Sequence, residues 1–361
     1  MLEFIKEKVS CWDRLRRAVK PIVLYGMGNG ADKIIDWCEA NNVKISAVFA
    51  SDEFVRGQQF RGFTVQKYTD VIEQFGSDIL IVIAFASELP EVLARFKEMA
   101  DSHEVLAPHL PLFDEAELVS EQWLAKYAQQ LQEVYEKLAD DSSRKVFADV
   151  LNYKLSGDVH YLFDCATDRR SDLTSIFSWT DSESYMDLGA YNGDTVCEFM
   201  ELTDNKFQEI IAVEPDRRNF RKLSAWAAEQ PDDVQSRITL HQAGVWDKQG
   251  ELGFSDSGGR QSSFLLGDKK AVPVDSIDSF AAGRSISYIK MDVEGVEAEA
   301  IAGGSHVIRT YKPKLFAAAY HYDADIFRLP LMLWQLVPEY KIYLRKHPYI
   351  PAWELNFFAL V

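Results

Sequence analysis

The sequence has few cysteines and no long apolar run. Four of its 361 residues are cysteines, and none lies in a C-x-x-C pair. This spacing predicts neither a zinc site nor a disulfide framework, and it favours a reducing cytoplasm as the location. The longest apolar run, residues 79–86, is far shorter than the ~20 residues that a membrane-spanning helix needs. We therefore expect no membrane insertion.

Basic residues are scarce relative to acidic ones. Lys and Arg total 39 and Asp and Glu total 56, which gives a net charge of −17. Such an excess of negative charge disfavours a nucleic-acid backbone or an anionic membrane as a partner. The N-terminal stretch MLEFIKEKVSCWDRLRR lacks the apolar core of a signal peptide, and we predict that it forms a surface helix.

Several hydrolytic and metal-binding patterns are also absent from the chain. There is no H-E-x-x-H sequence and no recognisable Ser/His/Asp arrangement, and the acidic residues lack the spacing of a calcium loop. These absences disfavour a hydrolase. The sequence assigns no metal ligands.

The chain is longer than a single hydrophobic core usually supports, so we expect more than one domain. The patterns divide it into a Rossmann-like α/β domain (1–112), a helical linker (113–182) and a larger α/β domain (183–361). In the linker, apolar residues recur at helical spacing, namely Leu124, Tyr127, Leu131, Tyr135 and Leu138. Burial of this stripe within the chain is the favoured interpretation, and a homodimer is the alternative.

The first domain contains predicted strands at 21–26, 44–50 and 78–86, which implies a parallel sheet. Residues 26–31 read G-x-G-x-x-A, the form of a dinucleotide-binding turn, and Asp52 or Glu53 follows the second strand. These acids lie further on than a ribose ligand usually does. A structural unit, or one that docks a biosynthetic partner, is therefore favoured over a dinucleotide site.

The larger domain shows a second succession of strands and helices. We predict strands at 185–188, 210–214, 238–242, 286–292, 314–320, 340–344 and 354–360. This pattern is typical of a doubly wound α/β sheet with a late hairpin-like pair.

The stretch YMDLGAYNGDT, residues 185–195, follows the first of these strands and precedes a helix. Gly189 and Gly193 allow backbone conformations that other residues resist, and the next helix presents unpaired N–H groups. The loop predicts a nucleotide-like ligand, with a plain strand-to-helix turn as the alternative.

Two more strand ends carry candidate cofactor ligands. Glu214 ends the second strand, where a carboxylate can accept both hydroxyls of a ribose. Its alternative role is to start a helix, because Pro215 would suit the first helical position. After the third strand, Gln242 and Ala243 are candidates for reading an adenine edge.

The fourth and fifth strand ends carry candidate catalytic groups. Lys290, Asp292 and Glu294 follow the fourth strand, and burial could make Asp292 a useful base. For Glu294 and the nearby Glu297, stabilisation of a helix N-terminus is the alternative. His321 ends the fifth strand as a second candidate base, with a structural hydrogen-bonding role as its alternative.

In combination, these segments resemble the FkbM family of S-adenosylmethionine-dependent methyltransferases. The resemblance rests on MDLGAYNGDT, AVEPD, AGVWDKQGELGF, VPVDSID, YIKMDVEGVEAEAIAGG and KPKLFAAAYH, which fall within residues 184–345. It implies the class I methyltransferase fold and, in many members, methylation of a hydroxyl on a sugar, polysaccharide precursor or secondary metabolite. The C-terminal YLRKHPYIPAWELNFFAL departs from the family, which leaves the acceptor open.

The site residues that the motifs and this resemblance imply fall into two groups. The cofactor-binding group is Asp187, Gly189, Ala190, Tyr191, Gly193, Asp194, Glu214, Pro215, Gln242, Ala243 and Glu294. The catalytic group is Asp292, His321 and Lys290.

Three alternatives to this interpretation stay open. A nicotinamide-dependent oxidoreductase could use the turn at 26–31, but no Y-x-x-x-K dyad follows it. A non-catalytic scaffold is the second alternative. In the third, a divalent metal would hold the acceptor through strand-end carboxylates.

Overall fold

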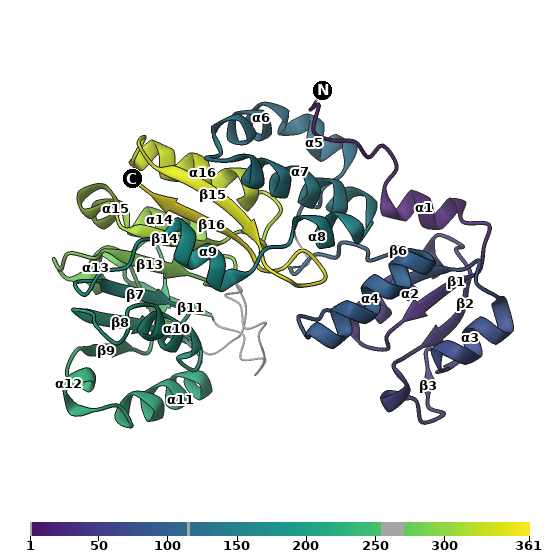
Figure 1. Cartoon of the computed structure of the whole chain (residues 1–361), viewed down its shortest axis with the longest axis horizontal. Coiled ribbons are helices and arrows are strands. Elements are labelled where there is room, and N and C mark those ends of the chain that lie inside the picture. The colour runs from purple at the N-terminus through teal and green to yellow at the C-terminus, as the bar shows by residue number, and fades with distance from the viewer. Residues whose placement is uncertain (1, 114–115, 254–270) are drawn as a thin grey trace. The chain divides into compact units, whose positions relative to one another are not determined.

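The computed structural model describes residues 2–113, 116–253 and 271–361. Phe254, the last residue of the AGVWDKQGELGF segment, lies outside this part. The chain forms two compact units, each assembled from separate segments (Figure 1). The first unit consists of Met1–Glu136, Asp141–Asp168 and Lys346–Glu354, and the second of Lys137–Asp140, Arg169–Arg345 and Leu355–Val361.

The first unit is built on a parallel sheet in the order β2-β1-β5-β6. Its strands are β1 (Ile22–Tyr25), β2 (Ile45–Phe49), β5 (Leu80–Ile83) and β6 (Glu104–Leu106). A hairpin adds β3 (Gln59–Phe60) and β4 (Phe63–Thr64), and the intervening helices are α2 (Asn29–Ala40), η1 (Asp52–Phe54), α3 (Tyr68–Phe75) and α4 (Pro90–Ser102). Strands β1 and β5 are buried along their whole length, which explains their continuous apolar sequence.

The prediction for the N-terminus is wrong over its first residues. Helix α1 spans only Cys11–Arg17, and Ser10 caps it by accepting a hydrogen bond from the backbone N–H of Asp13. Before it, Leu2 and Phe4 are buried, and the Phe4 ring stacks on Tyr135 with centroids 4.3 Å apart. A non-helical segment that begins with a turn at residues 3–4 therefore packs its apolar side chains where a surface helix was expected.

The helices of residues 113–182 contribute to both units. They are α5 (Glu121–Lys126), α6 (Ala128–Lys137), α7 (Asp141–Ser156), α8 (His160–Cys165) and α9 (Arg169–Ile176). Leu124, Leu131 and Leu138 of the predicted apolar stripe are buried within the chain.

The second unit is built on a seven-stranded sheet in the order β15-β16-β14-β13-β7-β8-β9, with helices on both faces (Figure 1). Its strands are β7 (Ser184–Leu188), β8 (Glu209–Val213), β9 (Ile238–His241), β13 (Tyr288–Met291), β14 (Lys314–Ala318), β15 (Lys341–Lys346) and β16 (Leu355–Leu360). Its later helices are α10 (Asp194–Leu202), α11 (Arg217–Ala228), α12 (Asp232–Gln235), α13 (Ile277–Ala281), α14 (Glu297–Gly303), α15 (Ser305–Tyr311) and α16 (Asp325–Leu336). The predicted doubly wound α/β architecture is confirmed.

Strands β7, β8, β9, β13 and β14 are parallel, and β16 pairs antiparallel with β14. After β7 the chain extends the sheet in one direction through β8 and β9, and it then returns to add β13 and β14 on the other side of β7. The carboxyl ends of β7 and β13 therefore meet where the strand order reverses. Ligands of open α/β sheets bind at such a point.

A small sheet that the sequence did not predict lies between β9 and α13 along the chain. Strand β12 (Ala271–Asp275) pairs with β10 (Gly244–Val245) and with β11 (Gly250–Gly253). The short apolar stretches here were too brief to distinguish from loops.

Aromatic rings fill the core on one face of the seven-stranded sheet. Tyr185 of β7 stacks on Tyr288 of β13 with centroids 4.8 Å apart, and Phe199 of α10 lies 4.4 Å from Tyr185. All three side chains are almost fully buried. This packing fixes β7, β13 and α10 relative to one another, and with them the loop that joins β7 to α10.

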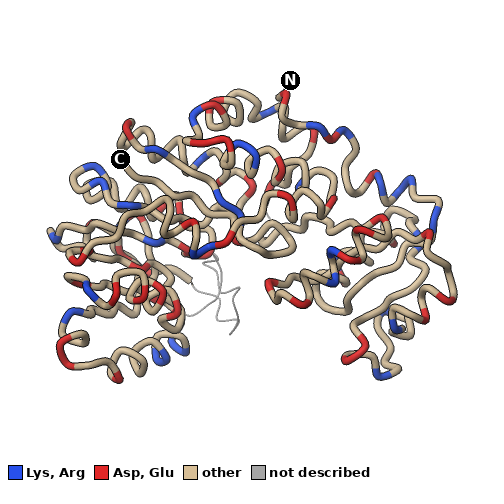
Figure 2. Tube along the Cα trace, viewed as in Figure 1, with Lys and Arg blue, Asp and Glu red and all other residues tan. Residues whose placement is uncertain are grey.

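Charged residues are distributed along both units, as Figure 2 shows for the described residues. None of the helices in the described part of the chain has the length and apolar character to cross a membrane.

The close approach of β7 and β13 gives a stability prediction. Gly189 has φ +80°, and a Cβ there would lie 2.0 Å from the Asp292 carbonyl oxygen. Gly283 has φ +79° but no neighbour within 4 Å of such a Cβ. We expect Gly283→Ala to lower the free energy of unfolding by about 1–2 kcal/mol, because alanine disfavours the left-handed backbone. Gly189→Ala should lower it by at least about 2 kcal/mol more, because its Cβ also meets the Asp292 carbonyl oxygen.

Urea denaturation of the two variants measures this difference. Equal losses in the free energy of unfolding would show that the backbone of Asp292 does not contact residue 189 closely.

Candidate active site

The loop after β7 is held against the end of β8 by backbone hydrogen bonds. The N–H groups of Gly189 and Ala190 both donate to the Val213 carbonyl oxygen at 3.0 Å. Gly193 then adopts the left-handed conformation, φ 96°, as the N-cap of α10 without any side-chain cap. The first turn of α10 thus begins directly beside the loop.

Lys290 joins the end of β13 to this loop. Its Nζ donates to the Gly189 carbonyl oxygen at 2.6 Å and lies 3.2 Å from Asp187 Oδ1. Both side chains are buried. Burial by itself lowers the pKa of Lys290, but the carboxylates of Asp187 and Asp292 outweigh it, so the net pKa is raised and the ammonium stays charged. These contacts are those of a residue that positions the loop, and the predicted catalytic role of Lys290 stays a prediction.

Glu214 lies at the end of β8 and is tied to the same loop. Its Oε2 accepts a hydrogen bond from the Tyr191 N–H and its Oε1 accepts one from the Asp216 N–H, both at 2.8 Å. The side chain is 5% exposed. Burial raises the pKa of Glu214 to about 7, although the two N–H donors act in the opposite direction.

The helix that follows Glu214 begins later than the sequence suggested. Asp216 is the N-cap of α11 and accepts hydrogen bonds from the N–H groups of Arg218 and Asn219. Pro215 therefore lies before the cap, and the prediction that it could occupy the first helical position is wrong. An Asp followed by a helical pattern is a recognised capping signal, and it could have identified Asp216.

The third predicted ligand position lies on the neighbouring strand. Val213 of β8 is in register with His241 of β9, so Gln242 and Ala243 follow β9 beside Glu214. Gln242 is exposed and Ala243 is buried. An adenine-reading role for either residue stays a prediction.

Asp292 and Glu294 extend from the end of β13 into a tight turn. The Tyr320 hydroxyl donates to the Asp292 carboxylate, at 3.1 Å from Oδ1 and 3.3 Å from Oδ2. Glu294 has a positive φ of 58°, which Gly295 follows with 92°. The Asp292 and Glu294 side chains are 33% and 34% exposed. The sequence did not predict the contact with Tyr320.

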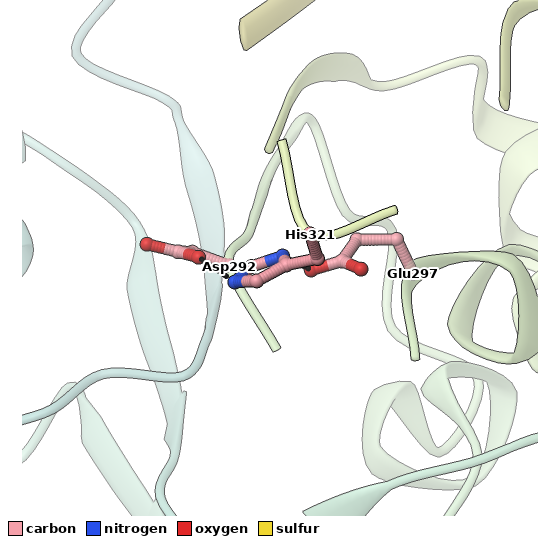
Figure 3. A group of neighbouring side chains, drawn as sticks. All are labelled: Asp292, Glu297 and His321. Atoms are coloured by element: carbon pink, nitrogen blue, oxygen red, sulfur yellow. Dashed lines mark ion pairs between the residues drawn. The ribbon is translucent and has the colours of Figure 1, made fainter. Parts of the chain in front are cut away.

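His321 lies between carboxylates, as Figure 3 shows for Asp292 and Glu297. Its Nδ1 is 3.0 Å from Glu297 Oε1, and its Nε2 is 3.4 Å from Glu294 Oε2 and 3.6 Å from Asp292 Oδ1. Burial favours the neutral ring, but the three carboxylates outweigh it and hold the pKa of His321 well above its usual value. The structure thus brings both predicted bases, Asp292 and His321, into one cluster.

Among the described residues, the same cluster is the one group of side chains close enough together to hold a metal ion. One ligand atom from each of Asp292, Glu297 and His321 lies within 4.8 Å of the others.

Comparisons with known proteins agree with this geometry. Residues 187–349 match the methyltransferase FkbM domain. The whole chain is similar in structure to a methyltransferase FkbM from Methylobacillus flagellatus KT, with a TM-score of 0.73 and 20% sequence identity over 99% of this chain and 94% of that one. No match was found among curated proteins.

Weaker structural likenesses involve about half of the chain. A precorrin-6y C5,15-methyltransferase from Geobacter metallireducens GS-15 has a TM-score of 0.34 and 12% identity over 54% of this chain and 92% of that one. A fibrillarin from Aeropyrum pernix has a TM-score of 0.31 and 13% identity over 50% and 68%.

The second unit has the fold of class I methyltransferases. More specifically, residues 187–349 form an S-adenosylmethionine-dependent methyltransferase domain of the FkbM family. The predicted family and cofactor are confirmed. The roles of individual site residues stay predictions.

The residues of the site fit this cofactor. Glu214 Oε1 and Oε2 each accept one backbone N–H and keep acceptor capacity for ribose hydroxyls. Asn192 Oδ1, in the loop itself, is buried with no hydrogen-bond partner among the described residues. A buried acceptor of this kind indicates a place for a donor group of a ligand. Asp187, Gly189, Ala190, Tyr191, Gly193 and Asp194 are the residues predicted to surround the methionine part, and of these Asp187 is fully buried beside Lys290.

The buried ion pair gives a second stability prediction. We expect Lys290→Met to destabilise the protein by about 3–5 kcal/mol, because it leaves the Asp187 carboxylate buried without its cation. The double variant Asp187→Asn/Lys290→Met should recover part of that loss. Lys206→Met, at an ion pair whose side chains are 66% and 84% exposed, should cost less than about 1 kcal/mol.

Chemical denaturation of the single and double variants measures the coupling. If the loss in free energy of unfolding in the double variant equals the sum of the losses in the two single variants, the two side chains do not interact in the folded state.

Proposed function

We propose that this protein transfers a methyl group from S-adenosylmethionine to a hydroxyl oxygen of a sugar, a polysaccharide precursor or a secondary metabolite. The main support for a cofactor site is the buried Glu214 carboxylate, which accepts a hydrogen bond from the backbone of the glycine loop (residues 189–193). The methyltransferase FkbM domain match supports the same reaction class.

The acceptor side of the proposal rests on the cluster at the end of β13. The backbone of Asp292 lies directly against Gly189 of the loop, and its carboxylate is partly exposed. A carboxylate placed there can accept the hydrogen bond of an incoming hydroxyl and then its proton. Methylation of an oxygen benefits from such proton removal by about 10²–10⁴-fold.

The cofactor supplies a methyl group that is already activated by the positive sulfur. When bound, it would give this methyl group to the acceptor oxygen and keep the electron pair of the broken S–C bond on sulfur, and a base of the cluster would take the hydroxyl proton. The chain's own part is to hold the acceptor oxygen in line at about 3 Å and to exclude water. Gly189, Gly193 and Glu214 position one reactant, and Asp292 orients the other.

The pKa of Glu214 gives a pH prediction for the cofactor site. Since burial raises this pKa to about 7, the carboxyl is mostly neutral at pH 6 and mostly ionised at pH 8. Only the ionised form accepts hydrogen bonds at both oxygens without donating one. We expect S-adenosylhomocysteine to bind about tenfold more weakly at pH 6 than at pH 8.

Isothermal titration calorimetry at the two pH values measures this change. Glu214→Gln should bind at least about tenfold more weakly at pH 8 and should lose the pH dependence, whereas Glu229→Gln, at the exposed end of α11, should behave like the wild type. Equal wild-type affinity at pH 6 and pH 8 would contradict the assigned role.

Transfer of a labelled methyl group tests the hydroxyl acceptor. Purified protein would be incubated with S-adenosylmethionine labelled in its methyl group and with sugars, sugar nucleotides, oligosaccharides or hydroxylated metabolites. We expect label in a product that resists mild alkali, because methyl ethers are stable where methyl esters hydrolyse. Alkali-labile label would indicate a carboxylate acceptor, and label on nitrogen would also contradict the proposal.

A further inference from the structure

The ends of β13 and β14 bring together three side chains of the kinds that ligate metal ions. Asp292 follows β13, Glu297 begins α14 and His321 follows β14. Figure 3 shows the His321 ring between the other two side chains, and one ligand atom from each lies within 4.8 Å of the others. Two ligands of one transition-metal ion lie at most about 4.4 Å apart, because each bond is about 2.0–2.2 Å long. A small inward movement of the partly exposed Asp292 side chain would therefore complete the set.

Glu297 contributes a buried oxygen that accepts no hydrogen bond from any described residue. Its side chain is fully buried, and its Oε1 accepts the Val293 N–H at 3.0 Å and lies 3.0 Å from His321 Nδ1. Its Oε2 is also buried, but no partner for it exists in the part of the chain that the structure describes. A buried carboxylate oxygen without a donor is unfavourable, and a bound cation offsets that loss. This oxygen indicates a ligand independently of the clustering of the three side chains.

The cluster also gathers several negative charges around one basic group. The carboxylates of Asp292, Glu294 and Glu297 all lie within 3.6 Å of the His321 ring. Like charges held this close repel one another, and a divalent cation among them relieves the repulsion. The carboxylates favour a metal cation at the ring for the same electrostatic reason that they favour a proton on it. One divalent ion would still leave the three carboxylates with an excess of negative charge.

The donor set indicates which ions the cluster would select. Mg²⁺ and Ca²⁺ prefer ligand sets made of oxygen atoms, whereas an imidazole nitrogen together with carboxylate oxygens suits Mn²⁺, Fe²⁺ or Zn²⁺. Glu297 and His321 are held by burial, and the Asp292 side chain is 33% exposed. One side of the ion would thus be open to a small molecule, as it is in catalytic metal sites.

We propose that Asp292, Glu297 and His321 bind one divalent transition-metal ion, and that the open side of this ion holds the acceptor hydroxyl. Binding of the ion is a property of the protein without any acceptor, but its role rests on the proposed methyl transfer. A cation beside the acceptor oxygen makes the hydroxyl proton easier to remove. That proton passes to Glu294, whose Oε2 lies 3.4 Å from His321 Nε2. The acceptor oxygen gains the methyl group, and sulfur keeps the electron pair of the broken S–C bond.

Binding of Mn²⁺ to the full chain tests the site without acceptor or cofactor. Metal-free protein would be titrated with Mn²⁺ in a buffer that contains millimolar Mg²⁺, which occupies weak sites on the acidic surface. Electron paramagnetic resonance reports the free Mn²⁺. We expect a single Mn²⁺ ion to bind per chain, and pulsed measurements on the bound ion should show coupling to one histidine nitrogen. This coupling distinguishes the site from one made of carboxylates alone.

Variants of the three ligands locate the bound ion. Asp292→Asn and Glu297→Gln should each weaken Mn²⁺ binding at least about tenfold, the loss that even an outer-shell partner causes, and His321→Gln should remove the nitrogen coupling. Glu299→Gln is the matched control, since Glu299 lies in the same first turn of α14, and it should bind Mn²⁺ like the wild type. Circular dichroism checks the fold of each variant. Asp292→Asn, at a partly exposed position, decides the result where Glu297→Gln fails to fold.

Three results would overturn the site. One is the absence of saturable Mn²⁺ binding, the second is bound Mn²⁺ without nitrogen coupling, and the third is equal Mn²⁺ affinity in Asp292→Asn and the wild type.

The role of the ion is tested with the acceptor found in the labelled-methyl experiment. Exhaustive chelation should lower turnover at least about tenfold, and added Mn²⁺ should restore it. The affinity for S-adenosylhomocysteine should stay within about twofold of that of the untreated protein. Full turnover after chelation would overturn this role. Absence of S-adenosylhomocysteine binding in the untreated protein would instead refute the proposed function, whereas the Mn²⁺ titration decides the metal site on its own.

Discussion

The buried ammonium of Lys290 is the contact on which the site depends. It reaches from β13 to the Gly189 carbonyl oxygen and to the Asp187 carboxylate, and so it joins the two strands between which the strand order reverses. A buried charge of this kind is tolerated only where its partner and its hydrogen bonds are fixed. The geometry of the glycine loop therefore follows from the pairing of β7 with β13, which aromatic packing holds in place.

The sequence predicted the local features of the methyltransferase domain well, because each depends on neighbouring residues. Apolar runs identified all seven strands of its sheet, and Gly189 and Gly193 identified a loop in which both have positive φ values. The position of Glu214 directly after β8 was predicted correctly because a single acidic residue follows the apolar strand, and its role in binding stays a prediction. In each case the side chain or backbone requirement can be read within about ten residues.

Features that depend on distant segments could not be read in the same way. Residues 346–354 belong to the first compact unit. Along the chain, however, they connect β15 to β16, which are both strands of the second unit's sheet. The hydrogen bond from Tyr320 to Asp292 and the ion pair of Glu297 with His321 each join different strands or helices. Residues 2–10 form no helix, although their sequence pattern is helical, because Leu2 and Phe4 are buried and Phe4 stacks on Tyr135, far along the chain.

The negative charge of Asp292 and Glu294, at the end of β13, also limits which acceptor groups could bind there. Asp292 and Glu294 are partly exposed, so an incoming group meets carboxylate oxygens that accept hydrogen bonds and repel anions. Hydroxyl groups are donors and suit this surface, whereas a phosphate or carboxylate placed there would face like charge. An anionic part of an acceptor, such as the diphosphate of a sugar nucleotide, would therefore have to lie away from Asp292.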